Sequence, residues 1–455
     1  MKPSRWRTAP RSEQKKQHGS VAWIQTVTSS SAQGTPGGVP GSSVSAVPGD
    51  QPYVAVIGGG PAGLIAAERM AIAGARVEVF EHKRSVGRKF LLAGRGGLNI
   101  THGEPIDDML VRFGEARTFL EPAIRAFSPA DLRCWSAGLG EPTFLGTSDR
   151  VFPQSFRATP LLRSWLQRLN EVGVEFRTGH RWTGWTKNGA NLFETPDGSL
   201  LTDQADATIF ALGGASWPRV GSDGGWAEPF RSAGIAVHDL EPANCGVLAN
   251  WSSVLREKFA GQPIKNAVFS CGGTTARGDG IITESGIEGG PIYALGPAVR
   301  RELADSGTAI LRVDLHPDLA LSALIRRLSK RRAKASVTSW LNSAGVSPVG
   351  VSLVRETTAN KLPNDPSGLA ELLKGLRITI NAMAPIDRAI SSAGGIALSE
   401  IDAGYMITRQ PGVFVAGEML DWEAPTGGYL LQACFSTGAA AANGVLTWLG
   451  GESPH

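Results

Sequence analysis

The sequence predicts an α/β fold built around a dinucleotide-binding βαβ unit, and three observations carry this prediction. A short apolar stretch, 54–57, runs directly into the glycine-rich "GGGPAG" and then into a helical pattern. Two later stretches, 205–216 and 412–428, repeat the order of a buried strand followed by glycines. At 455 residues the chain also exceeds one ordinary core, so two or three domains are expected.

The composition is that of a globular protein, with 42% hydrophobic and 19% charged residues. A net charge of +4, from 45 Lys and Arg against 41 Asp and Glu, is too small to predict a nucleic-acid partner. No apolar stretch approaches the roughly 20 residues that a membrane span needs. The four cysteines form no C-x-x-C pair, which argues against a zinc site or disulfide scaffold. We expect no metal, no membrane partner and a cytoplasmic location.

Residues 1–50 are rich in Ser, Gly, Pro, Thr and Gln and have no periodic apolar pattern. Such a segment buries too little apolar surface to offset the entropy of ordering, so it is predicted to be a disordered extension. A targeting segment and a misplaced start codon are the two alternatives that the sequence leaves open.

The first βαβ unit follows at once. Residues 54–57 are apolar and β-branched, as expected for a strand that is buried on both faces. Residues 64–73 are alanine-rich with helical spacing, Gly74 ends that helix, and 75–81 ("ARVEVFE") predict a second strand.

Further along, 158–179 predict a helix and a strand. Residues 205–216 predict a buried strand that enters a glycine turn at Gly213, which is also predicted to bind the cofactor. Residues from about 240 to 315 consist of short strand-like pieces with frequent glycine, which indicates an inserted β-rich domain. An amphipathic helical stretch, 319–345, contains the basic run 330–334, interpreted as a solvated helix face. Strands return after 376, and a long helix closes the chain.

The glycine run has the spacing of the dinucleotide fingerprint. Gly58 permits a tight turn, Gly60 lets the backbone approach a pyrophosphate, and Gly63 lets the helix pack on the strand. Pro61 and Ala62 lie between them, at the helix N-terminus that attracts phosphate. Glu81 ends the second strand roughly 20 residues later, where a carboxylate can bind ribose hydroxyls and disfavours a 2′-phosphate. FAD and NAD both remain possible at this point.

Two further segments favour FAD. The stretch 87–102 ("GRKFLLAGRGGLNITH") holds cations and a second glycine loop. A plain NAD site has no use for such a loop, whereas the longer FAD molecule must extend from its adenine end across the domain. The stretch 412–438 has carboxylates directly after a strand, where they can bind a polyol such as the ribityl chain of FAD. Its glycine turn begins a helix whose N-terminus can stabilise negative charge on a reduced flavin. The predicted cofactor-binding residues of these two segments are Arg88, Lys89, Gly94, Gly96, Asn99, Gly417, Glu418, Asp421, Thr426, Gly427, Gly428 and Tyr429.

The order of "VAVIGGGPAGLIAAE", "GRKFLLAGRGGLNITH", "RVFPQSFRATPLL", "FALGGASWPRVGSDG", "GGPIYAL", "SSAGGIALSEID" and "GVFVAGEMLDWEAPTGGYLLQACFSTG" resembles the BaiN-like (YhiN-type) bacterial FAD-dependent oxidoreductases. The resemblance covers about 53–450. It implies a two-segment Rossmann-type FAD-binding domain with an inserted β-barrel-like domain and a small helical subdomain. Many members read Gly-Gly-Gly-Arg-Cys-Asn where this chain has "GRGGLN", so Gly97 replaces the arginine and Leu98 the cysteine.

From these features we expect an FAD-dependent oxidoreductase that acts on a small organic substrate. No second G-x-G-x-x-G follows a strand, so a nicotinamide reductant, NAD(P)H, would dock only transiently. The alternatives are a non-catalytic or redox-sensing flavoprotein and a flavin-dependent nucleic-acid-modifying protein. His102 and Tyr429 are the nearest groups able to handle protons, but a single histidine beside a loop is more often structural, so neither is assigned as catalytic.

The expected domain organisation follows the same division. It comprises an extension (1–50), the first FAD-domain segment (51–239), the inserted β-rich domain (240–315), a helical subdomain (316–375), return strands of the insert (376–398) and the second FAD-domain segment (399–455).

Overall fold

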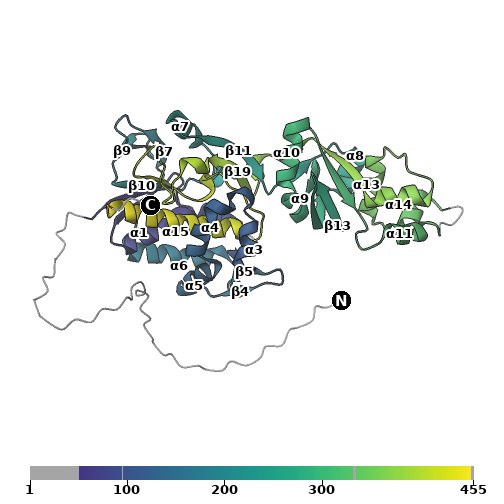
Figure 1. Cartoon of the computed structure of the whole chain (residues 1–455), viewed down its shortest axis with the longest axis horizontal. Coiled ribbons are helices and arrows are strands. Elements are labelled where there is room, and N and C mark those ends of the chain that lie inside the picture. The colour runs from purple at the N-terminus through teal and green to yellow at the C-terminus, as the bar shows by residue number, and fades with distance from the viewer. Residues whose placement is uncertain (1–50, 95, 331–334, 452–455) are drawn as a thin grey trace, which may run out of the picture. The chain divides into compact units, whose positions relative to one another are not determined.

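The computed structural model describes residues 51–94, 96–330 and 335–451, and the account below concerns these residues (Figure 1). The predicted extension 1–50 and most of the basic run 330–334 lie outside them. Within the described ranges, no helix has both the length and the apolar character required to cross a membrane.

A five-stranded parallel sheet forms the centre of the first core, in the order β20-β10-β1-β2-β6. Val56 of β1 pairs with Val79 of β2 on one side and with Ile209 of β10 on the other. Four of the five residues of β1 and all of β10 are buried, as the continuous apolar stretches predict. The strands are β1 (Tyr53–Ile57), β2 (Arg76–Glu81), β6 (Glu175–Thr178), β10 (Ala207–Phe210) and β20 (Val413–Val415).

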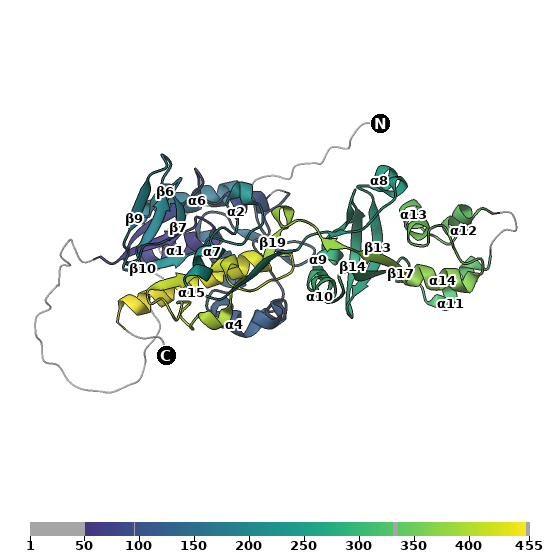
Figure 2. The same ribbon diagram turned by 90° about the horizontal axis from the view of Figure 1, so that it is seen from above.

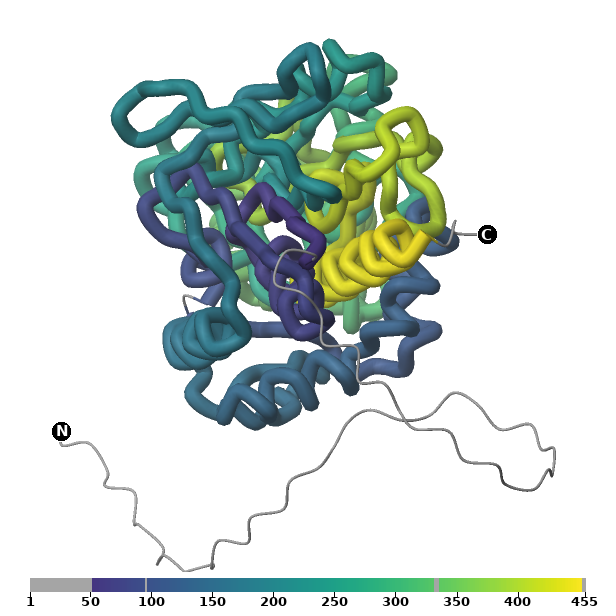
Figure 3. The backbone as a smooth tube through the Cα atoms, turned by 90° about the vertical axis from the view of Figure 1, so that its left-hand side faces the viewer, coloured from purple at the N-terminus to yellow at the C-terminus, as the bar shows by residue number. Residues whose placement is uncertain are grey.

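The two ends of the described chain meet in this core. Phe414 of β20 pairs with Ile209, so a strand from the C-terminal region completes the sheet started by β1. The helix α15 (Tyr429–Leu449) packs on α1 (Pro61–Ile72), as Figure 3 shows with the yellow helix beside the purple unit. Gly438 permits this approach, because a Cβ there would lie 2.3 Å from the Ala62 carbonyl oxygen.

Helices and short strands fill the chain between β2 and β10. They are α2 (Arg88–Ala93), β3 (Thr101–His102), α3 (Ile106–Val111), α4 (Arg117–Ala126), α5 (Pro129–Gly138), β4 (Thr143–Leu145), β5 (Arg150–Pro153), α6 (Ala158–Glu171), β7 (Arg181–Trp185), β8 (Asn191–Glu194) and β9 (Leu200–Asp203). The cations expected on a glycine loop therefore lie in the first turn of a short helix, α2, which Gly87 begins in a left-handed conformation (φ 70°).

A second core surrounds a seven-stranded sheet in the order β17-β16-β13-β14-β15-β12-β18, in which every pair is antiparallel (Figure 2). Its strands are β12 (Val247–Leu248), β13 (Pro263–Cys271), β14 (Thr274–Ile282), β15 (Gly286–Glu288), β16 (Ala309–Asp314), β17 (Leu376–Ile380) and β18 (Ala382–Met383). Its helices are α8 (Ser253–Phe259), α9 (Gly290–Ala294), α10 (Gly296–Ser306), α11 (Leu321–Leu328), α12 (Val337–Ser343), α13 (Pro348–Thr357) and α14 (Pro366–Lys374).

Two strands, β11 (Val237–Ala243) and β19 (Ser391–Ile396), pair antiparallel in the stretches that lead into and out of the second core. The helix α7 (Ala227–Ser232) precedes them. The predicted α/β fold class is confirmed: a parallel Rossmann-type sheet is combined with additional antiparallel sheets and helices. The division into six segments stays a prediction.

Candidate functional site

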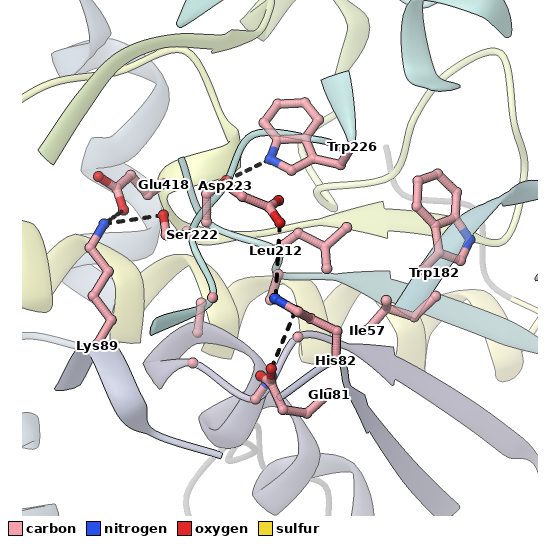
Figure 4. A pocket seen from close by; sticks show the side chains of 18 of the residues that line it. Ile57, Glu81, His82, Lys89, Trp182, Leu212, Ser222, Asp223, Trp226 and Glu418 are labelled. Atoms are coloured by element: carbon pink, nitrogen blue, oxygen red, sulfur yellow. Dashed lines mark hydrogen bonds and ion pairs between the residues drawn. The ribbon is translucent and has the colours of Figure 1, made fainter. Parts of the chain in front are cut away.

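A pocket lies at the carboxyl ends of β1, β2, β10 and β20, the edge at which open α/β sheets bind ligands. Its empty space, including the part open to solvent, is about 990 Å³. Figure 4 shows side chains from all four strand ends converging on it. Ten of the predicted residues line it, namely Gly58, Gly60, Pro61, Ala62, Glu81, Arg88, Lys89, Gly213, Gly417 and Glu418.

The three fingerprint glycines have three different surroundings. Gly58 has φ 113°, and a Cβ there would lie 2.3 Å from the Ala211 carbonyl oxygen. A Cβ on Gly63 would lie 2.0 Å from the Gly58 carbonyl oxygen, so this glycine serves helix–strand packing and does not line the pocket. A Cβ on Gly60 would meet no atom of the described chain within 4 Å. The space in front of Gly60 lies at the N-terminus of α1, whose free N–H groups and dipole attract an anion.

Glu81 ends β2 and is held by the neighbouring backbone. The Gly59 N–H donates to Oε2 (3.1 Å) and the Lys83 N–H donates to Oε1 (2.8 Å). Burial raises the pKa of this carboxyl group, while the two backbone hydrogen bonds act in the opposite direction. The bonds orient the carboxylate at the rim of the glycine turn, where it can accept hydrogen bonds from hydroxyl groups.

His82, directly after Glu81, is a pocket residue that the sequence reasoning missed. Its Nε2 is buried and has no hydrogen-bond partner among the described residues, and Asp223 Oδ2 is 4.0 Å from it. The other ring nitrogen, Nδ1, lies 3.4 Å from Glu81 Oε1. Asp223 is itself paired with Arg181 Nη1 at 3.1 Å. Burial and then the Arg181 charge lower the pKa of His82 to about 4, so its imidazole is neutral at neutral pH. The pocket therefore contains an unused polar atom next to Glu81.

This burial predicts a pH dependence of stability. The pKa of His82 is about 4 in the folded protein and 6.5 in the unfolded chain, so below pH 6.5 the unfolded chain binds the extra proton. The contribution of His82 to the free energy of unfolding is therefore complete above pH 6.5 and is lost as the pH falls towards 4. Urea unfolding of wild type and His82→Gln across this window measures the effect. The variant should show a shallower fall, and identical pH profiles would contradict the prediction.

Lys89 and Glu418 are brought together from opposite ends of the chain. Lys89 Nζ donates to Glu418 Oε2 (2.6 Å) and to Ser216 Oγ (2.7 Å), and Figure 4 shows it between Glu418 and Ser222. The second carboxylate oxygen of Glu418 accepts from the Ser392 N–H (2.9 Å). The predicted phosphate-binding cation therefore neutralises the predicted polyol-binding carboxylate.

The other predicted residues do not line this pocket. The turn before α15 presses on β3, since a Cβ on Gly428 would lie 2.5 Å from the backbone of Thr101. The Asn99 amide holds the same backbone by donating to the carbonyl oxygens of Thr101 (2.7 Å) and Val151 (3.1 Å). Tyr429 Oη donates to Glu104 Oε1 (2.6 Å). Outside the pocket lie Gly63, Gly94, Gly96, Asn99, Asp421, Thr426, Gly427, Gly428 and Tyr429.

Asp421 is directed to another partner. Its Oδ2 lies 2.6 Å from His238 Nδ1 of β11, and its N–H donates to the Ile396 carbonyl oxygen. This pairing joins the second segment to the β11–β19 ribbon. In this conformation Asp421 contributes no group to the pocket.

Side-chain packing explains the loop sequence "GRGGLN", in which this chain differs from the BaiN-like proteins that it resembles. A Cβ on Gly97 would lie 2.3 Å from the ring of Phe156, and Gly97 has φ 126°, so a side chain there is excluded twice. Leu98 is fully buried in the first core. The two replacements therefore substitute apolar packing for a cation and a thiol.

The residues that line the pocket form neither a metal-binding cluster nor a reactive thiolate. No cluster of three or more His, Cys, Asp or Glu side chains suited to a metal ion occurs among the described residues. Cys434 lines the pocket, but burial raises the pKa of its thiol to about 12.

Comparisons with known proteins give one family and several relatives. The model of the HI0933-like protein Rossmann domain matches residues 52–444. The chain is 26% identical to a 3-dehydro-bile acid delta(4,6)-reductase of Clostridium scindens, over 85% of this chain and 97% of that protein. It is 22% identical to a ribosomal RNA dihydrouridine synthase of Escherichia coli, over 86% of this chain and 97% of that protein.

Among solved structures, the chain is similar to 3-ketosteroid delta1-dehydrogenase from Sterolibacterium denitrificans in complex with 1,4-androstadiene-3,17-dione. The identity is 12% and the TM-score is 0.47, over 86% of this chain and 98% of that chain. A flavocytochrome c3 fumarate reductase is similar with 15% identity and a TM-score of 0.44, over 88% of this chain and 79% of that chain.

Proposed function

The chain belongs to the HI0933-like family, and on that premise we propose that it is an FAD-dependent oxidoreductase acting on a small organic substrate. Membership confirms the family resemblance that the motifs indicated. The observation that carries the proposal is the composition of the pocket. Groups from the first βαβ unit and from the C-terminal segment meet at one edge of a parallel sheet, as a cofactor long enough to touch both requires.

The residues of the pocket fit FAD. The open space at Gly60, in front of the N-terminus of α1, suits the pyrophosphate. Glu81 can accept from the adenosine ribose, and the unpaired Nε2 of His82 offers a polar contact to the adenine end. Glu418 has the carboxylate that suits the ribityl hydroxyls, with Lys89 neutralising it. Bound FAD would supply the electron transfer, and these residues would bind and orient it.

The flavin half of the cofactor is proposed to lie towards the glycine loop Gly94–Asn99 and the turn before α15. Both features press on one short strand, because Asn99 and Gly428 each contact the backbone of Thr101. A glycine at 427 (φ 131°) and at 428 (φ 98°) keeps this turn free of side chains. A planar ring system needs such a surface for close approach.

The proposed substrate class comes from a relative, and the proposed electron donor comes from the sequence. The C. scindens relative is named as a reductase of a 3-dehydro-bile acid, which favours an apolar carbonyl compound as the first substrate to test. NAD(P)H is proposed as a reductant that docks transiently, because the sequence contains one dinucleotide fingerprint after a strand.

A second candidate function, reduction of a uridine base in RNA, is favoured by one observation. The E. coli relative named as a ribosomal RNA dihydrouridine synthase matches nearly the whole chain. The expectation of no nucleic-acid partner thus stays a prediction that an RNA substrate can test.

The purified protein is expected to be yellow and to release FAD, not FMN, on denaturation, because Glu81, His82 and the Gly60 space would serve only the ADP half. Chromatography of the released flavin against both standards measures this. Anaerobic bleaching by NADH or NADPH, followed by reoxidation with a 3-dehydro-bile acid or with unmodified ribosomal RNA, separates the two candidate functions. Release of FMN alone, or no flavin after reconstitution, would contradict the proposed function.

A further inference from the structure

A polar cluster outside the pocket joins the turn before α15 to the loop after β3. It consists of His102, Glu104, Arg112 and Tyr429, and we call it the His102 cluster. Tyr429 Oη donates to Glu104 Oε1 at 2.6 Å, and Arg112 Nη2 donates to Glu104 Oε2 at 2.9 Å. The rings of His102 and Tyr429 stack with centroids 5.1 Å apart. Three separate parts of the chain are thereby held together.

The cluster determines which nitrogen of His102 carries a proton in the neutral ring. The Glu104 backbone N–H donates to His102 Nδ1 at 3.2 Å, so Nδ1 is the acceptor and the hydrogen belongs to Nε2. Within the described part of the chain, no hydrogen bond of Nε2 is present. His102 therefore presents an unused N–H donor of known position.

The free edge of the ring faces the turn at Gly427. A Cβ on Gly427 would lie 3.9 Å from His102 Cδ2, the ring carbon bonded to Nε2. The same Cβ would lie 2.9 Å from the ring of Tyr429. The imidazole edge and the side-chain-free turn thus lie beside each other, with the Tyr429 ring next to both.

Glu104 is held as a carboxylate. Burial opposes its ionisation, but the hydrogen bonds from Arg112 and Tyr429 prevail and lower its pKa. Burial and the bond to Glu104 raise the pKa of Tyr429, so the phenol stays neutral and remains the donor. The anchored Glu104 keeps its own backbone N–H in place on His102 Nδ1.

We propose that His102 is a hydrogen-bond donor, through Nε2, to an electron-rich carbonyl oxygen that binds against Gly427, and that Glu104 is the positioning residue for it. The inference rests on the proposed function, under which this oxygen belongs to the pyrimidine edge of the flavin. A fixed donor at an oxygen that gains negative charge on reduction stabilises the reduced form more than the oxidised form. His102 would therefore raise the reduction potential of bound FAD.

The test compares the FAD-loaded wild type with His102→Leu, which removes the donor. The control is His316→Leu, the same change at a histidine that follows β16 in the second core. The Nε2 atom of His316 also has no hydrogen-bond partner among the described residues. We expect His102→Leu to weaken binding of reduced relative to oxidised FAD about tenfold, which for two electrons lowers the midpoint potential by about 30 mV. His316→Leu should leave the potential unchanged.

A second pair of variants serves if His102→Leu does not fold. Gln at 102 can place an N–H donor near the Nε2 position and should keep the wild-type potential, whereas the shorter Asn cannot reach and should lower it. Equal potentials in wild type and His102→Leu, or in the Gln and Asn variants, overturn the inference and point to a substrate carbonyl or to no ligand. Failure of the wild type to bind FAD would instead defeat the proposed function.

Discussion

Replacement of Gly60 by valine is expected to abolish stable FAD binding while the apoprotein stays folded. Gly60 has an ordinary backbone conformation (φ −86°, ψ 179°), and a Cβ there meets no described atom within 4 Å. The new side chain therefore enters the space proposed for the pyrophosphate. Loss of the charge-assisted bonds at that site costs about 3 kcal/mol, or roughly a hundredfold in affinity. The free energy of unfolding of the apoprotein should change by no more than about 1 kcal/mol.

The control for this prediction is Gly63→Ala. Its Cβ would lie 2.0 Å from the Gly58 carbonyl oxygen, so the backbone of the glycine turn must shift, at a cost of about 2 kcal/mol of apoprotein stability. FAD titration and urea unfolding of the two variants distinguish a blocked pocket from a distorted fold. Full FAD stoichiometry and affinity in Gly60→Val would show that no phosphate lies at the N-terminus of α1.

Replacement of Lys89 by methionine has the second large expected effect. It leaves Glu418, whose side chain is 12% exposed, without the cation that lies 2.6 Å away. An uncompensated buried carboxylate is costly, and after allowance for the partial exposure of Lys89 the expected loss is about 2 kcal/mol of unfolding free energy. FAD affinity should fall as well, because Lys89 Nζ orients both Glu418 and Ser216.

Comparison of Lys89→Met, Glu418→Gln and the double variant separates the interaction energy of the ion pair from the contributions of the two individual side chains. Neutral glutamine can still accept from the Ser392 N–H, so the double variant should be more stable than Lys89→Met alone. Urea unfolding of the two single variants, the double variant and wild type completes the cycle. Additive losses would mean that the two side chains contribute independently, contrary to the geometry.

Much of the parallel sheet and the glycine turn could be predicted because their signals are local. The β-branched strands β1 and β10 are buried on both faces, and the apolar run in each is itself the signal. Gly63 is required by a contact at 2.0 Å with Gly58 inside one short βα unit, and Gly58 by its positive φ of 113° in the turn of the same unit. Glu81 follows from the same unit, since it ends the next strand.

Other parts of the site could not be predicted, because their partners come from distant segments that carry no motif. Arg181 and Asp223 bracket His82 from the chain after β6 and after β10, and the sequence signal for His82 was only its place beside Glu81. Asp421 has the spacing of a polyol ligand, but the fold pairs it with His238. Spacing along the chain predicts which side chains reach the same edge, but not the partner to which each one turns.

The sequence by itself therefore determined the α/β class, the family, the dinucleotide fingerprint and the second glycine turn, because each depends on backbone conformation and periodicity within a few dozen residues. The tertiary structure alone decided the pairing of Lys89 with Glu418, the unpaired nitrogen of His82 and the stacking of His102 on Tyr429, because each depends on contacts between segments far apart in the chain. Burial and hydrogen bonding set the charge and direction of a polar side chain, and both arise only when those segments pack together.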